Sequence, residues 1–220
     1  MGSEGPVAVK IHVTGFKKFQ GVPENPTETI VSNLKDFVDR RGLPPGITLG
    51  SCTVLETAGE GALPMLYKVM ESGISKPFMD SSINEQVIWV HFGVDSGLQK
   101  FDIEQQAVNE ATFCCPDELD WQPQQFPIIP EDGGISRTRQ TSCSVDAIVK
   151  YLKKKGYDVG ISNDAGLFVC NYVYYHSLQF AEQKGHKCLF VHVPLFSTID
   201  EDTQMQFAVS LLESFVSSTF

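Results

Sequence analysis

The chain has 220 residues, of which 42% are hydrophobic and 20% charged, and its formal net charge is −10. This composition fits one globular domain over 1–220 with a full core, in which we expect 1–6 to be flexible. The longest basic run is Lys153–Lys155, too short to follow a phosphate backbone, which argues against nucleic-acid binding. No apolar stretch reaches the roughly 18 residues that a membrane span needs.

Cysteine usage and the N-terminal residues bear on location and metal binding. The six cysteines are scattered without the spacing of a disulfide framework, and Cys114 and Cys115 are adjacent rather than spaced as zinc ligands are. Residues Met1–Pro6 lack the apolar core of a signal peptide. We therefore expect free thiols, no metal site and a cytoplasmic location.

Apolar runs of strand length alternate along the chain with segments of helical periodicity. The expected strands are Val7–Thr14, Ile47–Leu55, Val87–Phe92, Tyr157–Ser162 and Lys187–Val193. The expected helices are Thr27–Arg41 with Thr27 as N-cap, Gly61–Ser72 with Gly73 just past its end, Ser142–Lys155, Leu167–Gln183 and Asp202–Ser217. Ile103–Thr112 is ambiguous, and 113–140 is expected to be a long loop, of a kind that is often functional.

This alternation predicts an α/β fold with a mostly parallel sheet and helices on both faces. In such folds the chemistry lies at the carboxyl ends of the strands. The ends of the expected strands are therefore the first places to look for a site.

Cys170 lies in a segment, Ser162–Asn171, that joins an expected strand to an expected helix. In the first turn of that helix, unpaired N–H groups and the positive end of the helix dipole stabilise thiolate over thiol. A small buried core residue explains the position of Cys170 equally well, because free cysteine is often buried.

His192 ends the strand that follows this helix. If the sheet is parallel here, the start of the helix and the end of the next strand share one edge, so Cys170 and His192 should meet. A Cys–His pair is the minimum set for thiol acyl transfer. A third group usually holds the histidine's tautomer, and the residues alone offer several acids without choosing one.

The loop after the first expected strand contains two phenylalanines, Phe16 and Phe19, and is followed by Asn25-Pro26-Thr27. Aromatic side chains are costly to expose, so the two rings either pack beneath the loop or form an apolar wall for a small ligand. Packing is the better of the two interpretations on the residues alone.

Four segments together resemble the pyroglutamyl peptidase I family. They are Thr14–Phe19 with Asn25-Pro26, Gly93–Asn109, Ser162–Tyr175 and Val191–Pro194. The resemblance covers nearly the whole chain in the family's order. It implies a single-domain three-layer α/β/α sandwich (phosphorylase/hydrolase-like) and a cysteine peptidase that removes an N-terminal pyroglutamyl residue through a thioester, with no cofactor.

The resemblance also implies roles for single residues. Cys170 matches the nucleophile, His192 the base, and Glu104 opens the family's Glu-x-x-Ala-x-Asn run and so supplies the third member of a triad. The residues that match the family's substrate-binding positions are Phe16, Phe19, Asn25, Val94, Phe168 and Val169. Many bacterial members have a glutamine where Val94 stands and Gly-Gly-Arg at Ser96–Leu98, which concerns substrate affinity more than reaction type.

The partners that the resemblance implies are pyroglutamyl peptides, and since the family includes tetramers and monomers, a homo-oligomer is compatible with it. Two alternatives remain at this point. The protein could bind pyroglutamyl-capped N-termini without cleaving them, or it could be a related thiol amidase with a different acyl substrate.

Overall fold

The computed structural model describes residues 8–74 and 85–217, so the expectation of a flexible 1–6 falls outside them. The strands are β1 (Ala8–Phe16), β2 (Ile47–Leu55), β3 (Glu85–Val94), β4 (Phe101–Glu104), β5 (Gln106–Val108), β6 (Glu110–Ala111), β7 (Phe126–Pro127), β8 (Thr138–Gln140), β9 (Val159–Ser162) and β10 (Lys187–Val193). The helices are α1 (Pro26–Arg41), α2 (Gly59–Ile74), the 3-10 helix η1 (Pro130–Asp132), α3 (Val145–Lys154), α4 (Val169–Lys184) and α5 (Glu201–Ser217).

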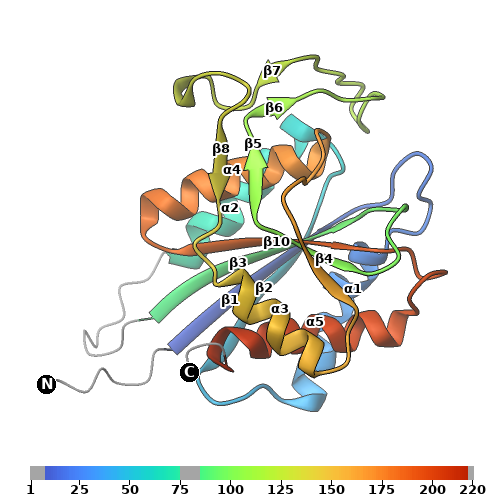
Figure 1. The fold of residues 1–220 in the computed structure, drawn as a ribbon, viewed down its shortest axis with the longest axis vertical. Helices are drawn as coiled ribbons and strands as arrows, with labels where there is room; N and C mark the ends of the chain where they lie inside the picture. Colours follow the sequence, from blue (N-terminus) through green and yellow to red (C-terminus); the bar gives the residue numbers. More distant parts are fainter. Residues whose placement is uncertain (1–7, 75–84, 218–220) are drawn as a thin grey trace, which may run out of the picture.

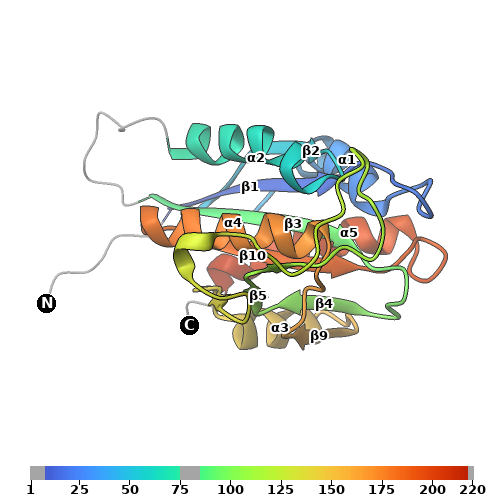
Figure 2. The same cartoon turned by 90° about the horizontal axis from the view of Figure 1, so that it is seen from above.

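One six-stranded sheet forms the middle layer, with the strand order β2-β1-β3-β10-β4-β9. The first four strands are mutually parallel, β4 is antiparallel to β10, and β9 is parallel to β4. Helices α2 and α4 cover one face, whereas α1, α3 and α5 cover the other (Figure 1; Figure 2 gives the view from above). The expected α/β sandwich with a mostly parallel sheet is thereby confirmed.

Strand alternation sends consecutive side chains to opposite layers. On β10, Leu189, Val191 and Val193 join the apolar core beneath α1, α3 and α5. Their neighbours Cys188 and Phe190 join a second, more aromatic core beneath α2 and α4. The side chain of His192 therefore lies on the α2/α4 side of the sheet.

The described α-helices all start at residues other than the expected ones, and for α1 and α2 the contacts show why. The N-cap of α1 is Asn25 rather than Thr27, because the Asn25 side chain accepts the Thr27 N–H at 3.0 Å and Pro26 fits the first helical position, which needs no donor. Helix α2 begins at Gly59, whose N–H donates to Asp117 Oδ2 at 2.9 Å, and it includes Gly73. A cap from a distant carboxylate has no local sequence signal.

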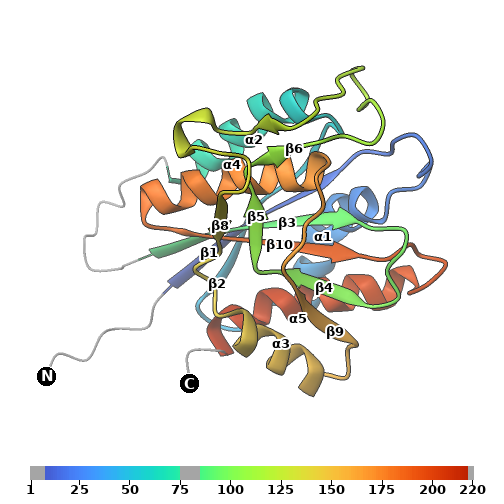
Figure 3. The same cartoon turned by 45° about the horizontal axis from the view of Figure 1, so that its top comes forward.

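The chain between β4 and α3 leaves the main sheet. The ambiguous stretch 103–112 contains the end of β4 and the whole of β5 and β6, and the expected long loop 113–140 contains β7, η1 and β8. Strand β5 pairs with β8, and β6 with β7, both antiparallel. We call residues 105–141 the arm; Figure 3 shows its strands β5 and β8 beside α4.

Candidate active site

Cys170 is half-buried in the first turn of α4, as expected. The N-cap residue, Phe168, is extended and offers no side-chain hydrogen bond to the helix. The N–H groups of the first turn are therefore left to bind another acceptor. The turn into the helix passes through Gly166 at a φ of 77°, a conformation that glycine adopts without strain.

Cys170 and His192 do meet, as predicted. The predicted reason, that β9 and β10 are parallel, is wrong. Strand β9 runs opposite to β10, because β4 between them is antiparallel to β10. The two residues meet because α4 and the following strand β10 run in opposite directions and have nearly equal lengths. From Cys170 to Gly185 the helix rises roughly 22 Å, and from Gly185 to His192 the strand returns roughly 23 Å.

A carboxylate, that of Glu104, contacts the Nδ1 atom of His192. Its Nδ1 lies 2.7 Å from Glu104 Oε1, and both side chains are buried. Burial by itself lowers the pKa of His192, but Cys170, within hydrogen-bonding reach, and Glu104 outweigh it and raise that pKa to about 10. Both neighbours thereby favour the protonated form of the imidazole.

Two residues beside the thiol were missed by the sequence analysis. A Cβ at Gly93 would lie 2.8 Å from Cys170 Sγ and 2.7 Å from the Phe190 ring. Any residue other than glycine at this position would therefore clash with the thiol. The Phe190 ring centroid is 4.9 Å from that of His192 and 6.3 Å from that of Phe16. Two-residue spacing along β10 places Phe190 on the same face as His192, and this signal was available in the sequence.

The predicted substrate-binding residues lie at two places near Cys170 and His192. Phe16 is buried at the end of β1 and reaches His192 through Phe190. Phe19 is half-buried in the following loop. Asn25 is buried beside it, where its Oδ1 accepts the Thr27 N–H and its Nδ2 donates to the Lys17 carbonyl at 2.9 Å. The side chain of Asn25 therefore fixes the backbone of this loop.

The other three predicted residues flank the nucleophile. Val94 is the half-buried last residue of β3 and lies opposite Val193. Phe168 is half-buried, with its ring edge-to-face to that of Phe113 at 4.6 Å between centroids. Val169 is buried at the start of α4. Their roles toward a substrate stay predictions.

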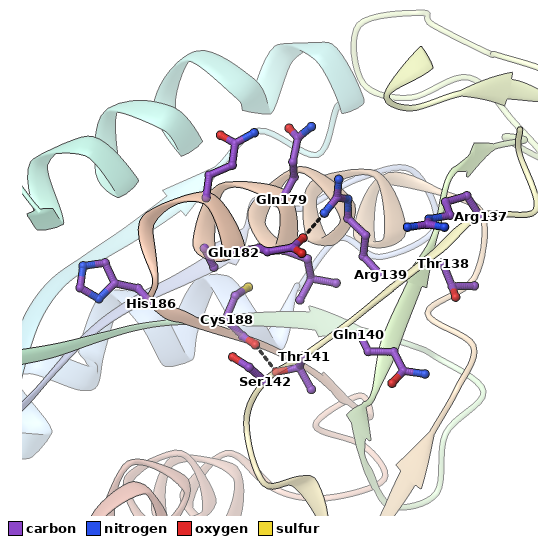
Figure 4. A pocket seen from close by; sticks show the side chains of 13 residues that line it. Arg137, Thr138, Arg139, Gln140, Thr141, Ser142, Gln179, Glu182, His186 and Cys188 are labelled. Carbon is purple, nitrogen blue, oxygen red and sulfur yellow. Dashed lines mark hydrogen bonds and ion pairs between the residues drawn. The ribbon is translucent and has the colours of Figure 1, made fainter. Parts of the chain in front are cut away.

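A separate cavity of about 630 Å³ lies between β8 and the C-terminal half of α4 (Figure 4). Its side chains are mostly polar, and Arg139 forms an ion pair with Glu182 across it. None of the predicted site residues lines it. The cavity is thus distinct from the site at the other end of α4.

A cysteine at a helix start, next to a histidine that a buried glutamate holds, in an α/β sandwich, defines the class of cysteine-type hydrolases. The pyroglutamyl peptidase family, Peptidase_C15, matches residues 9–213 of the chain. The chain therefore belongs to the pyroglutamyl peptidase family, and the expected enzyme class is confirmed.

Individual relatives agree. The chain is 32% identical over 190 residues to the pyrrolidone-carboxylate peptidase of Pyrococcus furiosus, an alignment that covers 84% of this chain and 81% of that protein. The corresponding enzyme of Enterococcus faecalis is 31% identical over 216 residues, with 96% and 90% covered. The solved structure of a mutant pyrrolidone carboxyl peptidase from P. furiosus superposes with a TM-score of 0.80 at 26% identity, covering 96% of this chain and all of that one.

Within residues 8–74 and 85–217, no helix combines the length and apolarity that crossing a bilayer requires.

Proposed function

We propose that this enzyme hydrolyses the amide bond after an N-terminal pyroglutamyl residue, with Cys170 as nucleophile, His192 as proton carrier and Glu104 as the group that orients His192. The observation that carries the proposal is the buried His192–Glu104 hydrogen bond of 2.7 Å next to the Cys170 thiol. Membership of the pyroglutamyl peptidase family supports the choice of substrate.

In acylation, the thiolate of Cys170 attacks the pyroglutamyl carbonyl carbon and forms a C–S bond. The imidazolium of His192 gives its proton to the leaving nitrogen, the C–N bond breaks, and the shortened peptide departs as an amine. Glu104 accepts the Nδ1–H of His192 and so presents Nε2 to the reacting atoms.

In deacylation, neutral His192 takes a proton from water, and the hydroxide attacks the thioester carbon. The C–S bond breaks, free pyroglutamate leaves, and the thiolate–imidazolium pair is restored. In both steps the oxyanion is stabilised by the free N–H groups of the first turn of α4, including that of Cys170.

The acyl group is small, flat and neutral, with one donor and one acceptor. A slot walled by Phe16, Phe19 and Phe168 suits such a ring, while backbone groups near Val94 and Val169 meet its N–H and C=O. Asn25 holds the loop that carries Phe19. A free glutamyl residue would leave its charges uncompensated in this slot and would be rejected.

The test compares purified wild-type enzyme with Cys170→Ser under reducing conditions, using a fluorogenic pyroglutamyl amide. Wild type should release the fluorophore, and the variant, with unchanged circular dichroism, should not. The matching prolyl amide keeps the five-membered ring but lacks the lactam carbonyl, so it should be a poor substrate.

Three results would count against the proposal. A folded wild type that binds the pyroglutamyl amide without releasing fluorophore would indicate a binding protein. Turnover that free pyroglutamate fails to inhibit at high concentration would indicate a thiol amidase with another acyl group. Turnover retained in Cys170→Ser would exclude Cys170 as the nucleophile.

A further inference from the structure

Glu104 lies where the chain leaves the main sheet. It is the last residue of β4, and after Gln105 the chain continues as β5 in the arm. The Gln105 N–H donates to the Ser162 carbonyl at 2.7 Å, and its carbonyl accepts the Thr141 N–H at 3.0 Å. In the main sheet Glu104 is paired with Phe190 of β10 and Ser162 of β9. The chain directly after it belongs to the arm, so the arm also influences where its side chain points.

Helix α4, which carries Cys170, also holds the Glu104 backbone. The Tyr174 hydroxyl donates to the Glu104 carbonyl at 2.9 Å. Cys170 and Tyr174 are four residues apart, so they lie one above the other on the same face of the helix. Tyr174 is fully buried, with its ring centroid 5.4 Å from that of Phe190. Burial raises the pKa of Tyr174 well above its usual value, so its hydroxyl stays a donor.

Asn171 fastens the first turn of α4 to the start of the arm. Its Oδ1 accepts the Val108 N–H at 2.9 Å, and its Nδ2 donates to the carbonyls of Val108 at 2.8 Å and Glu110 at 3.0 Å. The side chain is fully buried. Because both ends of the amide are engaged with the arm, Asn171 acts on backbone and not on substrate.

We propose that Asn171 and Tyr174 are positioning residues that hold Glu104 in register with the helix that carries Cys170. The proposal rests on the proposed triad. The Glu104–His192 hydrogen bond is 2.7 Å long, and a displacement of about 1 Å would take it beyond useful length. One helix that places both the nucleophile and the acid's backbone prevents such a displacement.

The decisive variant is Tyr174→Phe, which removes one hydroxyl and keeps the ring against Phe190. Its matched control is Tyr175→Phe. The Tyr175 hydroxyl also donates a hydrogen bond from α4, but its acceptor is Asp132 Oδ2 in the arm, at 2.8 Å and far along the chain from Glu104. Each variant loses one hydrogen bond that a tyrosine of α4 donates, to β4 in one case and to the arm in the other, so the melting temperatures of both should fall by similar amounts.

With the pyroglutamyl amide, kcat of Tyr174→Phe should fall about tenfold with KM within about twofold, because Glu104 is misplaced and the slot is not. Both constants of Tyr175→Phe should stay within about twofold of wild type. Equal kcat losses in the two tyrosine variants, or none in either, would overturn the proposal.

A second readout needs no pyroglutamyl substrate. The rate of Cys170 alkylation by iodoacetamide, compared between about pH 6 and about pH 9, reports how well the imidazolium stabilises the thiolate. The rate at about pH 6 divided by the rate at about pH 9 should fall about fivefold in Tyr174→Phe. In Tyr175→Phe this ratio should stay at the wild-type value. Identical ratios in all three proteins would refute the positioning role.

The two readouts separate the two proposals. If wild type does not cleave the pyroglutamyl amide but the alkylation ratio changes only in Tyr174→Phe, the proposed substrate is wrong and the positioning role stands. Asn171→Asp keeps the acceptor for the Val108 N–H but opposes two carbonyl oxygens, so it should lower the same ratio further. A normal ratio in folded Asn171→Asp would remove Asn171 from the proposal.

Discussion

The two faces of the central sheet are built from the same strands and differ in what they carry. Beneath α1, α3 and α5, the strands present Ile11, Val90, Val191 and similar side chains, which form an apolar core. Beneath α2 and α4, the alternate positions present buried polar groups as well as aromatic rings. Those polar groups are His12, Thr14, His91, Glu104 and His192.

One sheet thus serves two purposes: one face stabilises the fold, and the other carries the candidate site. The apolar face gains free energy from burial without any need for paired polar groups. The other face buries groups that cost free energy unless they are paired, and the proposed Glu104 and His192 of the triad are among them. Because side chains alternate, neighbouring residues on one strand should differ in whether their substitution affects stability or catalysis.

The largest expected effect is on the polar face. Glu104→Gln should lower kcat about 10³-fold, since a neutral amide neither orients His192 nor stabilises its charge. The carboxylate helps raise the pKa of His192 to about 10, so its loss should move the alkaline limb of kcat/KM about 1–2 pH units lower. An alkaline limb that stays at the wild-type pH would show that Glu104 is not part of the proposed triad.

A substitution on the apolar face of β10 should act on stability alone. Leu189 is fully buried in the apolar core, one residue before Phe190. Leu189→Ala should lower the free energy of unfolding by about 3 kcal/mol through lost burial and the cavity left behind. Its kcat/KM, measured well below the melting temperature, should stay near that of wild type. A large loss of activity in the folded variant would show that the faces are coupled.

Gly93→Ala tests the space beside the thiol. The new methyl group would meet Cys170 Sγ and the Phe190 ring at less than van der Waals distance, so the thiol must move. We expect kcat/KM to fall about 10²-fold with a smaller change in melting temperature. Unaltered kinetics in this variant would mean that Cys170 does not attack from its observed place.

The smallest effect concerns acid stability. Burial lowers the pKa values of His12 to about 4, His91 to about 3 and His176 to about 4. The unfolded chain binds these protons near pH 6.5 and the folded chain does not, so stability should fall as the pH drops below about 6.5. His176→Gln should reduce this slope by up to about 1.4 kcal/mol per pH unit, measured by urea unfolding between about pH 7 and pH 5. An unchanged slope would contradict the assignment.

Much of the fold could be predicted because local patterns determine it. The bounds of β2 and β10 were predicted to the residue, since each is rich in strand-forming residues and follows shortly after a glycine. The short strands β5 to β8 were not, because two or three residues carry no period. The reversed direction of β4 and β9 depends on which strands pair, and no local pattern encodes that choice.

The site shows the same limit. Cys170 and His192 could be proposed from their places at element ends, whereas Glu104 followed only from resemblance to a family. Asn171 contacts Val108 across 63 residues of sequence, and Tyr174 contacts Glu104 across 70. Contacts between residues so far apart in sequence depend on how the layers of the fold pack together. The sequence alone therefore could not predict these partners.

In the proposed mechanism, Cys170 carries the pyroglutamyl group as a thioester. Rapid acid quenching of wild type during turnover of a pyroglutamyl substrate, followed by peptide mass spectrometry, tests it directly. We predict one pyroglutamyl group on the peptide that contains Cys170, and none in Cys170→Ser. Turnover without this adduct, or with the group on another residue, would contradict the account.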